Sequence, residues 1–136
     1  MKTTLENVIP YEFRCFSENN GTLIPVESNV DVPFLIKRVF YVYGITDETV
    51  RGKHAHYKSE QVLVCFNGRI DVKCFDGSGW GNYILDSPRK ALLIPAMIWD
   101  EQIYYKDSIL CVFSNQKYER NDYITDFEKF KELKND

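Results

Sequence analysis

The stretch Gln61–Phe75, QVLVCFNGRIDVKCF, decides the class of fold. It opens with the apolar run Gln61–Phe66 and then reaches Asn67-Gly68, the pair of residues that most strongly favours a tight β-hairpin turn. In the return segment Arg69–Phe75, apolar and charged residues alternate, which is the period of a strand with one buried face. A β-hairpin of two antiparallel strands is therefore expected here.

Similar strand patterns recur at short intervals on both sides of this hairpin. They fall in the segments Thr22–Val26, Phe34–Tyr43, Arg51–His56, Tyr83–Leu85, Ala91–Ile94, Ile98–Tyr105 and Ile109–Phe113. From Asp122 onward the apolar residues follow helical spacing instead, which predicts a short amphipathic helix capped by Asn121 or Asp122. Many short strands separated by turns favour a sandwich or barrel, so we predict an all-β fold that ends in a short helix.

The size and composition of the chain limit what it can be. With 136 residues, no repeat and no linker, residues 1–136 are expected to form one domain, and 44% hydrophobic residues suffice for a core. The 17 basic and 20 acidic residues give a net charge of −3, so a nucleic-acid partner is not expected. No run approaches the roughly 18 apolar residues of a membrane span, and the N-terminus lacks a secretory signal. We therefore expect no membrane partner and a cytoplasmic location.

The four cysteines occupy positions 15, 65, 74 and 111, and no two of them form a C-x-x-C pair. Three of them lie inside apolar runs that have the pattern of strands. This placement predicts buried free thiols in a reducing compartment rather than a disulfide or a thiolate metal site.

Both histidines of the chain lie in the segment Arg51–His56, RGKHAH. On a strand, residues two apart point the same way with Cα atoms roughly 6.5–7 Å apart, so His54 and His56 are expected to project from one wall. Imidazoles titrate near neutral pH, so such a pair can act as base and acid without a metal. We predict that the two histidines are catalytic proton-transfer residues, and a solvated pair on the outer face is the alternative.

Basic and aromatic residues near this strand suggest a ligand. Arg51 lies three residues before His54, and Arg38 lies just before the aromatic strand. Guanidinium groups suit an anionic group of a ligand, such as a diphosphate. Tyr41 and Tyr43 share one face of their strand and are candidates to stack on a sugar or base ring, with core packing as the alternative. These two arginines and two tyrosines are predicted to bind the substrate.

The spacing of His54, His56, Glu60 and Gly68 resembles the first motif of the cupin superfamily, whose double-stranded β-helix often binds a metal. The second cupin motif supplies a further histidine ligand, but here Trp99 stands in its place. We therefore predict no metal site, with a site of two histidines and one carboxylate as the alternative.

Five segments together resemble one family within this superfamily. They are Lys37–Tyr41, Arg51–His56, Glu60–Val64, Leu92–Trp99 and Tyr118–Ile124. The segments resemble the WxcM-like cupins, and more narrowly the dTDP-4-keto-6-deoxyglucose 3,4-ketoisomerases. The resemblance implies a cupin-type jelly roll and a metal-independent isomerase that needs no cofactor.

The resemblance also implies a reaction and its setting. The substrate would be a dTDP-linked 4-keto-6-deoxy sugar, whose carbonyl moves from C4 to C3 through an enediol. The product would feed an aminotransferase that makes a 3-amino sugar for lipopolysaccharide or another surface polysaccharide. The enzyme would be a homodimer that exchanges N-terminal strands, for which Lys2–Val8 and Glu12–Phe16 are the expected segments.

The resemblance assigns roles to single residues as well. His54 and His56 match the proton-transfer residues of the family, and Arg51 matches an active-site cation that can stabilise enolate charge. Which histidine acts at carbon stays open, and so does the configuration at C4 of the product, gluco or galacto. The residues expected by position to control that configuration are Asn20, Trp99, Asp100 and Glu101.

Three other functions are compatible with the histidine pair. A sugar-nucleotide epimerase also removes a proton next to the ketone but leaves the carbonyl in place. A noncatalytic sugar-nucleotide-binding module needs no paired base, so the two histidines and Arg51 argue against it. A metal-dependent oxygenase would lose its activity to a chelator.

Overall fold

The computed structural model describes residues 2–135 and is dominated by antiparallel strands. The strands are β1 (Ile9–Glu12), β2 (Phe16–Glu18), β3 (Gly21–Leu23), β4 (Arg38–Val42), β5 (Thr49–His56), β6 (Gln61–Asn67), β7 (Ile70–Phe75), β8 (Trp80–Leu85), β9 (Lys90–Ile94), β10 (Trp99–Tyr104), β11 (Ile109–Ser114) and β12 (Tyr123–Ile124). The helical elements are the 3-10 turns η1 (Leu5–Asn7) and η2 (Arg120–Asp122) and the α-helix α1 (Phe127–Lys134).

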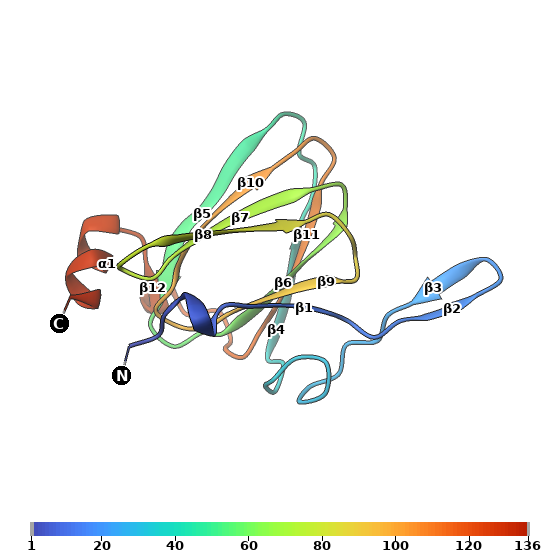
Figure 1. The fold of residues 1–136 in the computed structure, drawn as a ribbon, viewed down its shortest axis with the longest axis horizontal. Coiled ribbons are helices and arrows are strands. Elements are labelled where there is room, and N and C mark those ends of the chain that lie inside the picture. The colour runs from blue at the N-terminus through green and yellow to red at the C-terminus, as the bar shows by residue number, and fades with distance from the viewer. Residues whose placement is uncertain (1, 136) are drawn as a thin grey trace.

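Two five-stranded sheets enclose the core (Figure 1). One sheet has the strand order β1-β9-β6-β11-β4, and the other has the order β12-β5-β10-β7-β8. The chain crosses repeatedly between them, which makes a cupin-type jelly roll. The hairpin β2–β3 projects from one end of the molecule, and α1 lies at the opposite end (Figure 1). The prediction of an all-β jelly roll with a short C-terminal helix is therefore confirmed.

The strands β6 and β7 form as predicted, but they do not pair with each other as a hairpin. They lie in opposite sheets, where β6 pairs with β9 and β11, and β7 pairs with β8 and β10. Leu63 of β6 and Val72 of β7 are buried in the same core cluster, so the two strands meet through side chains. The turn residue Gly68 has a φ of 78°, a conformation that favours glycine.

The apolar run of β6 reflects burial on both of its faces. Leu63 and Cys65 point into the core between the sheets, whereas Val62 and Val64 pack outside the sheet against Phe13 and other apolar residues of the N-terminal half. A strand covered on two sides reads as a continuous apolar run rather than an alternating one. The cysteines follow the prediction: Cys65, Cys74 and Cys111 are buried, and all four are free in the described chain.

The C-terminal helix begins later than its spacing predicts. Asp126, and not Asn121 or Asp122, caps it, because the Asp126 carboxylate accepts a hydrogen bond from the Lys129 backbone N–H. Before the helix, Tyr123 and Ile124 form β12 and pair with His56 and Ala55 of β5. The helical spacing of the apolar residues therefore spans two elements, the short edge strand β12 and the helix α1. Among residues 2–135, no helix is long and apolar enough to cross a membrane.

The N-terminal segments also differ from the prediction. Lys2–Val8 contains the turn η1 rather than a strand, because Thr4 and Asn7 cap each other through side-chain and backbone hydrogen bonds. The first strand is β1, which pairs with β9 of the same chain. Glu12–Phe16 is not one strand: Glu12 ends β1, Phe16 begins β2, and residues 13–15 link β1 to the projecting hairpin β2–β3.

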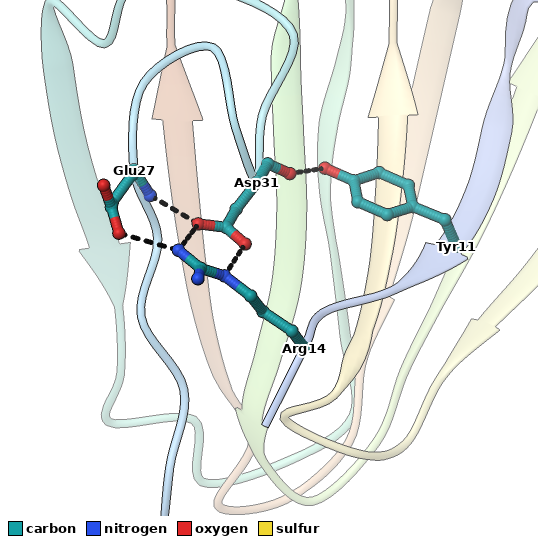
Figure 2. Close-up of polar contacts among 4 residues, drawn as sticks. All are labelled: Tyr11, Arg14, Glu27 and Asp31. Atoms are coloured by element: carbon teal, nitrogen blue, oxygen red, sulfur yellow. Dashed lines mark hydrogen bonds and ion pairs between the residues drawn. The ribbon is translucent and has the colours of Figure 1, made fainter. Parts of the chain in front are cut away.

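An ion pair between exposed Arg14 and buried Asp31 holds the base of this hairpin (Figure 2). The Arg14 guanidinium donates to both carboxylate oxygens of Asp31, at 2.7 and 3.0 Å, and to Glu27 at 2.7 Å. The Glu27 backbone N–H donates to Asp31 as well, and the Tyr11 hydroxyl donates to the Asp31 carbonyl at 2.7 Å. The hairpin lies between Arg14 and Glu27 in sequence, so these contacts fix both of its ends to the sheet.

Candidate active site

The strand β5 contains a β-bulge that sets the direction of its functional side chains. Arg51 and His54 are three residues apart, so a regular strand would point them to opposite faces. Gly52 and Lys53 instead adopt positive φ angles of 83° and 58°, and the register against β10 shifts by one residue at this point. A bulge of one residue brings Arg51 to the same face as the histidines.

Close packing against β10 adds a second reason for glycine at position 52. A Cβ built on Gly52 would lie 3.1 Å from Asp100 Oδ1 and 3.4 Å from Gln102 Cδ. The bulge thus places the backbone of β5 directly against the polar side chains of its neighbour.

Three rings form the centre of the site. The imidazole centroids of His54 and His56 are 4.8 Å apart, and the Tyr123 ring lies 4.5 Å from His56 and 5.3 Å from His54. His56 is 6% exposed. Both histidines therefore project from the same face of β5, as predicted, and Tyr123 of β12 contacts them.

The charge state of His56 follows from its burial. Burial, the neighbouring His54 and the Arg38 guanidinium lower its pKa from 6.5 to about 4, against a smaller opposing effect of Asp122. The imidazole is thus neutral at pH 7. Its Nε2 atom is buried and has no hydrogen-bond partner among residues 2–135. A neutral imidazole with a free nitrogen can accept or donate a proton at a ligand.

Arg38 supplies a cation next to these rings. Its guanidinium lies over the rings of Phe40 and Tyr118, at 4.6 and 5.4 Å from their centroids, and Nη2 donates to the Tyr123 hydroxyl at 3.1 Å. Its Nε is buried and unpaired within the described part of the chain. Aromatic rings hold the planar group in one orientation, so its free N–H is directed rather than mobile.

A chain of hydrogen bonds follows β10 on the interior side. The Tyr104 hydroxyl donates to Gln102 Oε1 at 2.7 Å, and Gln102 Nε2 donates to Asp100 Oδ1 at 2.8 Å. Asp100 is paired in register with His54 and is 2% exposed, and burial raises the pKa of its carboxyl group. Burial also raises the pKa of Tyr104, and the nearby Arg51 opposes this. Arg51 and Asp100 therefore belong to one polar wall with the histidines.

Two of the predicted site residues, Trp99 and Glu101, lie on the face of β10 that points away from the histidines. Because Asp100 faces the interior, its neighbours Trp99 and Glu101 face the outside of the sheet. Trp99 is buried there against Phe127 and Phe130 of α1, and its Nε1 donates to Glu101 at 3.1 Å. The structure does not bring these two residues to the histidines; it places Trp99 in a small core under the helix, with half-buried Glu101 beside it.

Three further predicted residues lie on the surface of the single chain. Tyr41 and Tyr43 are 67% and 71% exposed, because Phe40 takes the inward position on β4. Asn20 lies in the exposed turn of the hairpin β2–β3. Within residues 2–135, therefore, none of the three joins the cluster around His56.

Sequence reasoning missed several residues of the site. They are Phe40, Gln102, Tyr104, Tyr118, Asp122 and Tyr123. The spacing of Tyr123 predicts a helix, and Gln102 and Tyr104 belong to no motif. The signal that was available is the segment Tyr118–Ile124, which formed part of the family resemblance.

Open space adjoins the cluster on the side of Tyr118 and Tyr123. A cavity of about 730 Å³ is lined by Lys37, Tyr57, Lys58, Gln116, Lys117, Tyr118, Glu119, Asn121 and Asp122. A second cavity of about 630 Å³ shares Tyr57, Tyr118 and Asn121 with it and includes Tyr123. Among residues 2–135, no group of three or more His, Cys, Asp or Glu side chains is arranged to hold a metal ion.

Several known proteins are similar to this chain in sequence and fold. The TDP-4-oxo-6-deoxy-alpha-D-glucose-3,4-oxoisomerase of Aneurinibacillus thermoaerophilus is 37% identical over 128 residues, which cover 93% of this chain and 91% of that protein. The TDP-fucose-3,4-ketoisomerase WlaRA of Campylobacter jejuni is 36% identical with a TM-score of 0.89, over 94% of this chain and 96% of that chain.

A variant of the 3,4-ketoisomerase QdtA of Thermoanaerobacterium thermosaccharolyticum, in complex with TDP-4-keto-6-deoxyglucose, is 29% identical with a TM-score of 0.91, over 96% of this chain and 95% of that chain. The dTDP-4-dehydrorhamnose 3,5-epimerase of Bacillus anthracis has a TM-score of 0.77 at 17% identity, over 90% of this chain and 80% of that chain. At that identity the likeness shows a shared fold alone.

The family model described as FdtA, WxcM-like, C-terminal matches residues 6–135. It covers nearly the whole chain, including the bulged histidine strand and the segment that carries Tyr123. The chain therefore belongs to the FdtA family of WxcM-like proteins, as its sequence motifs predict.

Proposed function

We propose that the protein is a sugar-nucleotide 3,4-ketoisomerase, which moves the carbonyl of a dTDP-linked 4-keto-6-deoxyhexose from C4 to C3. One observation carries the proposal: the buried, neutral imidazole of His56 has a free nitrogen beside His54, in a chain whose relatives are 3,4-ketoisomerases. The residues 1–136 act as one isomerase domain.

The chemistry needs a base and stabilisation of negative charge. The C3 proton is acidified by the C4 ketone, and its removal gives an enediol that must be protonated at C4. One imidazole of the pair His54 and His56 would take the C3 proton and return it at C4, and the other would move a proton between the two sugar oxygens. Arg51 and Arg38 supply positive charge for the developing enolate and for the diphosphate.

The cavity next to Tyr118 suits the nucleotide part of the substrate. Its rim carries Lys37, Lys58 and Lys117, whose ammonium groups can bind phosphate oxygens. The rings of Tyr57 and Tyr118 line the same cavity and can stack on a base. The sugar would then reach the histidines past Tyr118.

Asp100 is the best placed of the four residues expected to control the configuration at C4. It faces the interior opposite His54, so its carboxyl group would lie on one side of the enediol. Trp99 and Glu101 would act only through the packing of α1. Asn20 would take part only if the hairpin of a second subunit reaches the site.

We propose a homodimer in which N-terminal strands are exchanged. The single chain exposes Phe16 and Leu23 on its projecting hairpin, Val39 and Tyr41 on the edge strand β4, and Tyr43 directly after that strand. Apolar side chains on a projecting hairpin and an open sheet edge favour burial against another chain. Light scattering at micromolar concentration should give twice the mass of 16.0 kDa, and a stable monomer would contradict the dimer.

The setting follows from the product. A 3-keto-6-deoxy sugar is the substrate form that an aminotransferase needs to make a 3-amino sugar. We infer that the enzyme works in the cytoplasm in the biosynthesis of such a sugar for lipopolysaccharide or another surface polysaccharide. The net charge of −3 gives no reason to expect a nucleic-acid partner.

The experiment is turnover of dTDP-4-keto-6-deoxyglucose followed by proton NMR, with His54→Asn and His56→Asn alongside. The proposal expects a 3-keto product, lost in one or both variants and unchanged by a chelator. A product that keeps its 4-keto group with inverted neighbours would indicate an epimerase. Binding without turnover would indicate a noncatalytic module, and loss of activity on chelation that only a metal restores would indicate a metalloenzyme.

A further inference from the structure

Asp122 is a buried residue that the proposed chemistry does not use, although it directly precedes Tyr123. Three successive residues after β5 donate hydrogen bonds to it. The Tyr57 N–H donates to its backbone carbonyl at 2.9 Å, and the Lys58 N–H donates to Oδ1 at 2.7 Å. The N–H and the hydroxyl of Ser59 both donate to Oδ2, at 3.1 and 2.5 Å. Four hydrogen bonds thus join one residue to the whole turn.

This turn directly continues the histidine strand. β5 ends at His56, which is paired with Tyr123 of β12. The hydrogen bond from Tyr57 to the Asp122 carbonyl extends that pairing by one residue. Because β12 is only two residues long, its own pairing supplies few hydrogen bonds to hold it. Asp122 therefore anchors the end of β12 beside His56, and buried Ile124 anchors the other end in the core under α1.

The contact that this anchor controls is the packing of two rings. The Tyr123 ring lies 4.5 Å from the His56 imidazole, at an interplanar angle of 64°. Asp122 holds the backbone on both sides of this contact, since it binds the residue after His56 and is itself the residue before Tyr123. Its carboxylate is also close enough to His56 to oppose burial and His54, which lower the pKa of that imidazole.

We propose that Asp122 is a positioning residue that holds the His56 imidazole against the Tyr123 ring, in the orientation that turnover requires. This inference rests on the proposed function and adds a residue to it. A displacement of about 1 Å at a catalytic group can cost about 10²-fold in rate. The hydrogen bonds of a residue that does not touch the substrate can therefore determine kcat.

Asp122→Asn tests the assignment, because it keeps the size of the side chain. An amide NH2 group cannot accept a hydrogen bond, so part of the turn loses its acceptor. We expect kcat on dTDP-4-keto-6-deoxyglucose to fall about tenfold to a hundredfold. Asp76→Asn is the matched control, because the Asp76 carboxylate also accepts from three backbone N–H groups, those of Leu5, Ser78 and Gly79, which all lie outside β5 and β12. Both variants should unfold at lower denaturant concentration than the wild type, but Asp76→Asn should keep the wild-type kcat.

A second measurement needs no substrate. The chain contains two histidines, so untagged protein labelled with carbon-13 and nitrogen-15 in histidine alone gives two sets of ring signals, one of them from His56. The ring current of Tyr123 acts on the His56 imidazole 4.5 Å away, so these signals report the packing of the two rings. They should move in Asp122→Asn and stay in place in Asp76→Asn, although both variants lose stability.

Ser59→Ala gives a milder form of the same test, because it keeps the carboxylate and removes only the hydroxyl contact at 2.5 Å. The His56 signals should move in the same direction as in Asp122→Asn, by a smaller amount. Wild-type turnover is measured first, and an inactive wild type overturns the proposed function and this inference together. With an active wild type, His56 signals that stay in place in both Asp122→Asn and Ser59→Ala overturn the inference alone. So does a loss that appears in KM with kcat unchanged.

Discussion

Replacing Gly52 with alanine tests the bulge that aligns Arg51 with the histidines. Gly52 and Gly44 share a φ of 83°, so an alanine at either position takes on the left-handed conformation, at a cost of about 1–2 kcal/mol. The two sites differ in their surroundings. A Cβ at Gly44 meets no atom of residues 2–135 within 4 Å beyond its chain neighbours, whereas a Cβ at Gly52 lies 3.1 Å from Asp100 Oδ1.

The contact at Gly52 forces Asp100 to move, and overpacking of this kind typically adds about 1–3 kcal/mol. We therefore expect Gly52→Ala to lower the free energy of unfolding by about 2–5 kcal/mol and Gly44→Ala by about 1–2 kcal/mol. Denaturant titration of both variants measures the difference. Gly52→Ala should also lower kcat/KM about tenfold to a hundredfold, since it displaces the wall facing His54. Equal stability of the two variants, with full activity in both, would refute the account of the bulge.

Three further predictions concern stability. Because the pKa of folded His56 lies near 4 rather than 6.5, the unfolded chain binds more protons between these values, so stability should fall by up to about 3 kcal/mol as the pH drops from 6.5 to 4. His56→Asn should flatten that slope in a pH series of melts, and an unchanged slope would contradict the low pKa. Buried Lys134 donates to the carbonyls of Thr3 and Met97, at 2.7 and 3.0 Å, and so ties the C-terminal helix to the N-terminal segment. Lys134→Met should lower the free energy of unfolding by about 1–3 kcal/mol, whereas Lys131→Met, at a more exposed position, should lower it by under about 0.5 kcal/mol. Equal losses in the two variants would contradict this role of Lys134. Arg14 holds the pKa of Asp31 below its usual range, so the stability that Asp31 contributes is present above pH 4 and lost in stronger acid. Asp31→Asn should remove that acid dependence and speed proteolysis of the hairpin Phe16–Leu23. Unchanged cleavage would show that the ion pair does not hold the hairpin.

Local patterns predicted most of the strands, and they failed where a residue's partner lies far away in sequence. The alternation of apolar and charged residues and the turn at Asn67 predict β6 and β7 correctly, but these patterns do not indicate which strands pair with each other. β6 pairs with β9 and β11 and is covered on both of its faces, and a run of apolar residues does not distinguish this arrangement from a hairpin. Tyr123 and Ile124 likewise fit helical spacing, yet pairing with β5 makes them a strand.

The histidines were predicted correctly as a pair on one wall, since that needs only the period of a strand. Arg51 reaches the same wall for a reason that its spacing does not contain, a bulge at Gly52 and Lys53. The direction of Trp99 and Glu101 depended on which face of β10 is interior, and that is set by the whole barrel. A single sequence places residues near one another on a strand, but the sheet decides where each one points.

The most direct test of the central claim is carbon-13 NMR of dTDP-4-keto-6-deoxyglucose incubated with the wild-type protein. The account predicts that the keto carbon resonance disappears from C4 and appears at C3, with a new C–H bond at C4. A sugar that keeps its keto group at C4, whether untouched or exchanged with solvent only at neighbouring carbons, would contradict the proposed isomerisation.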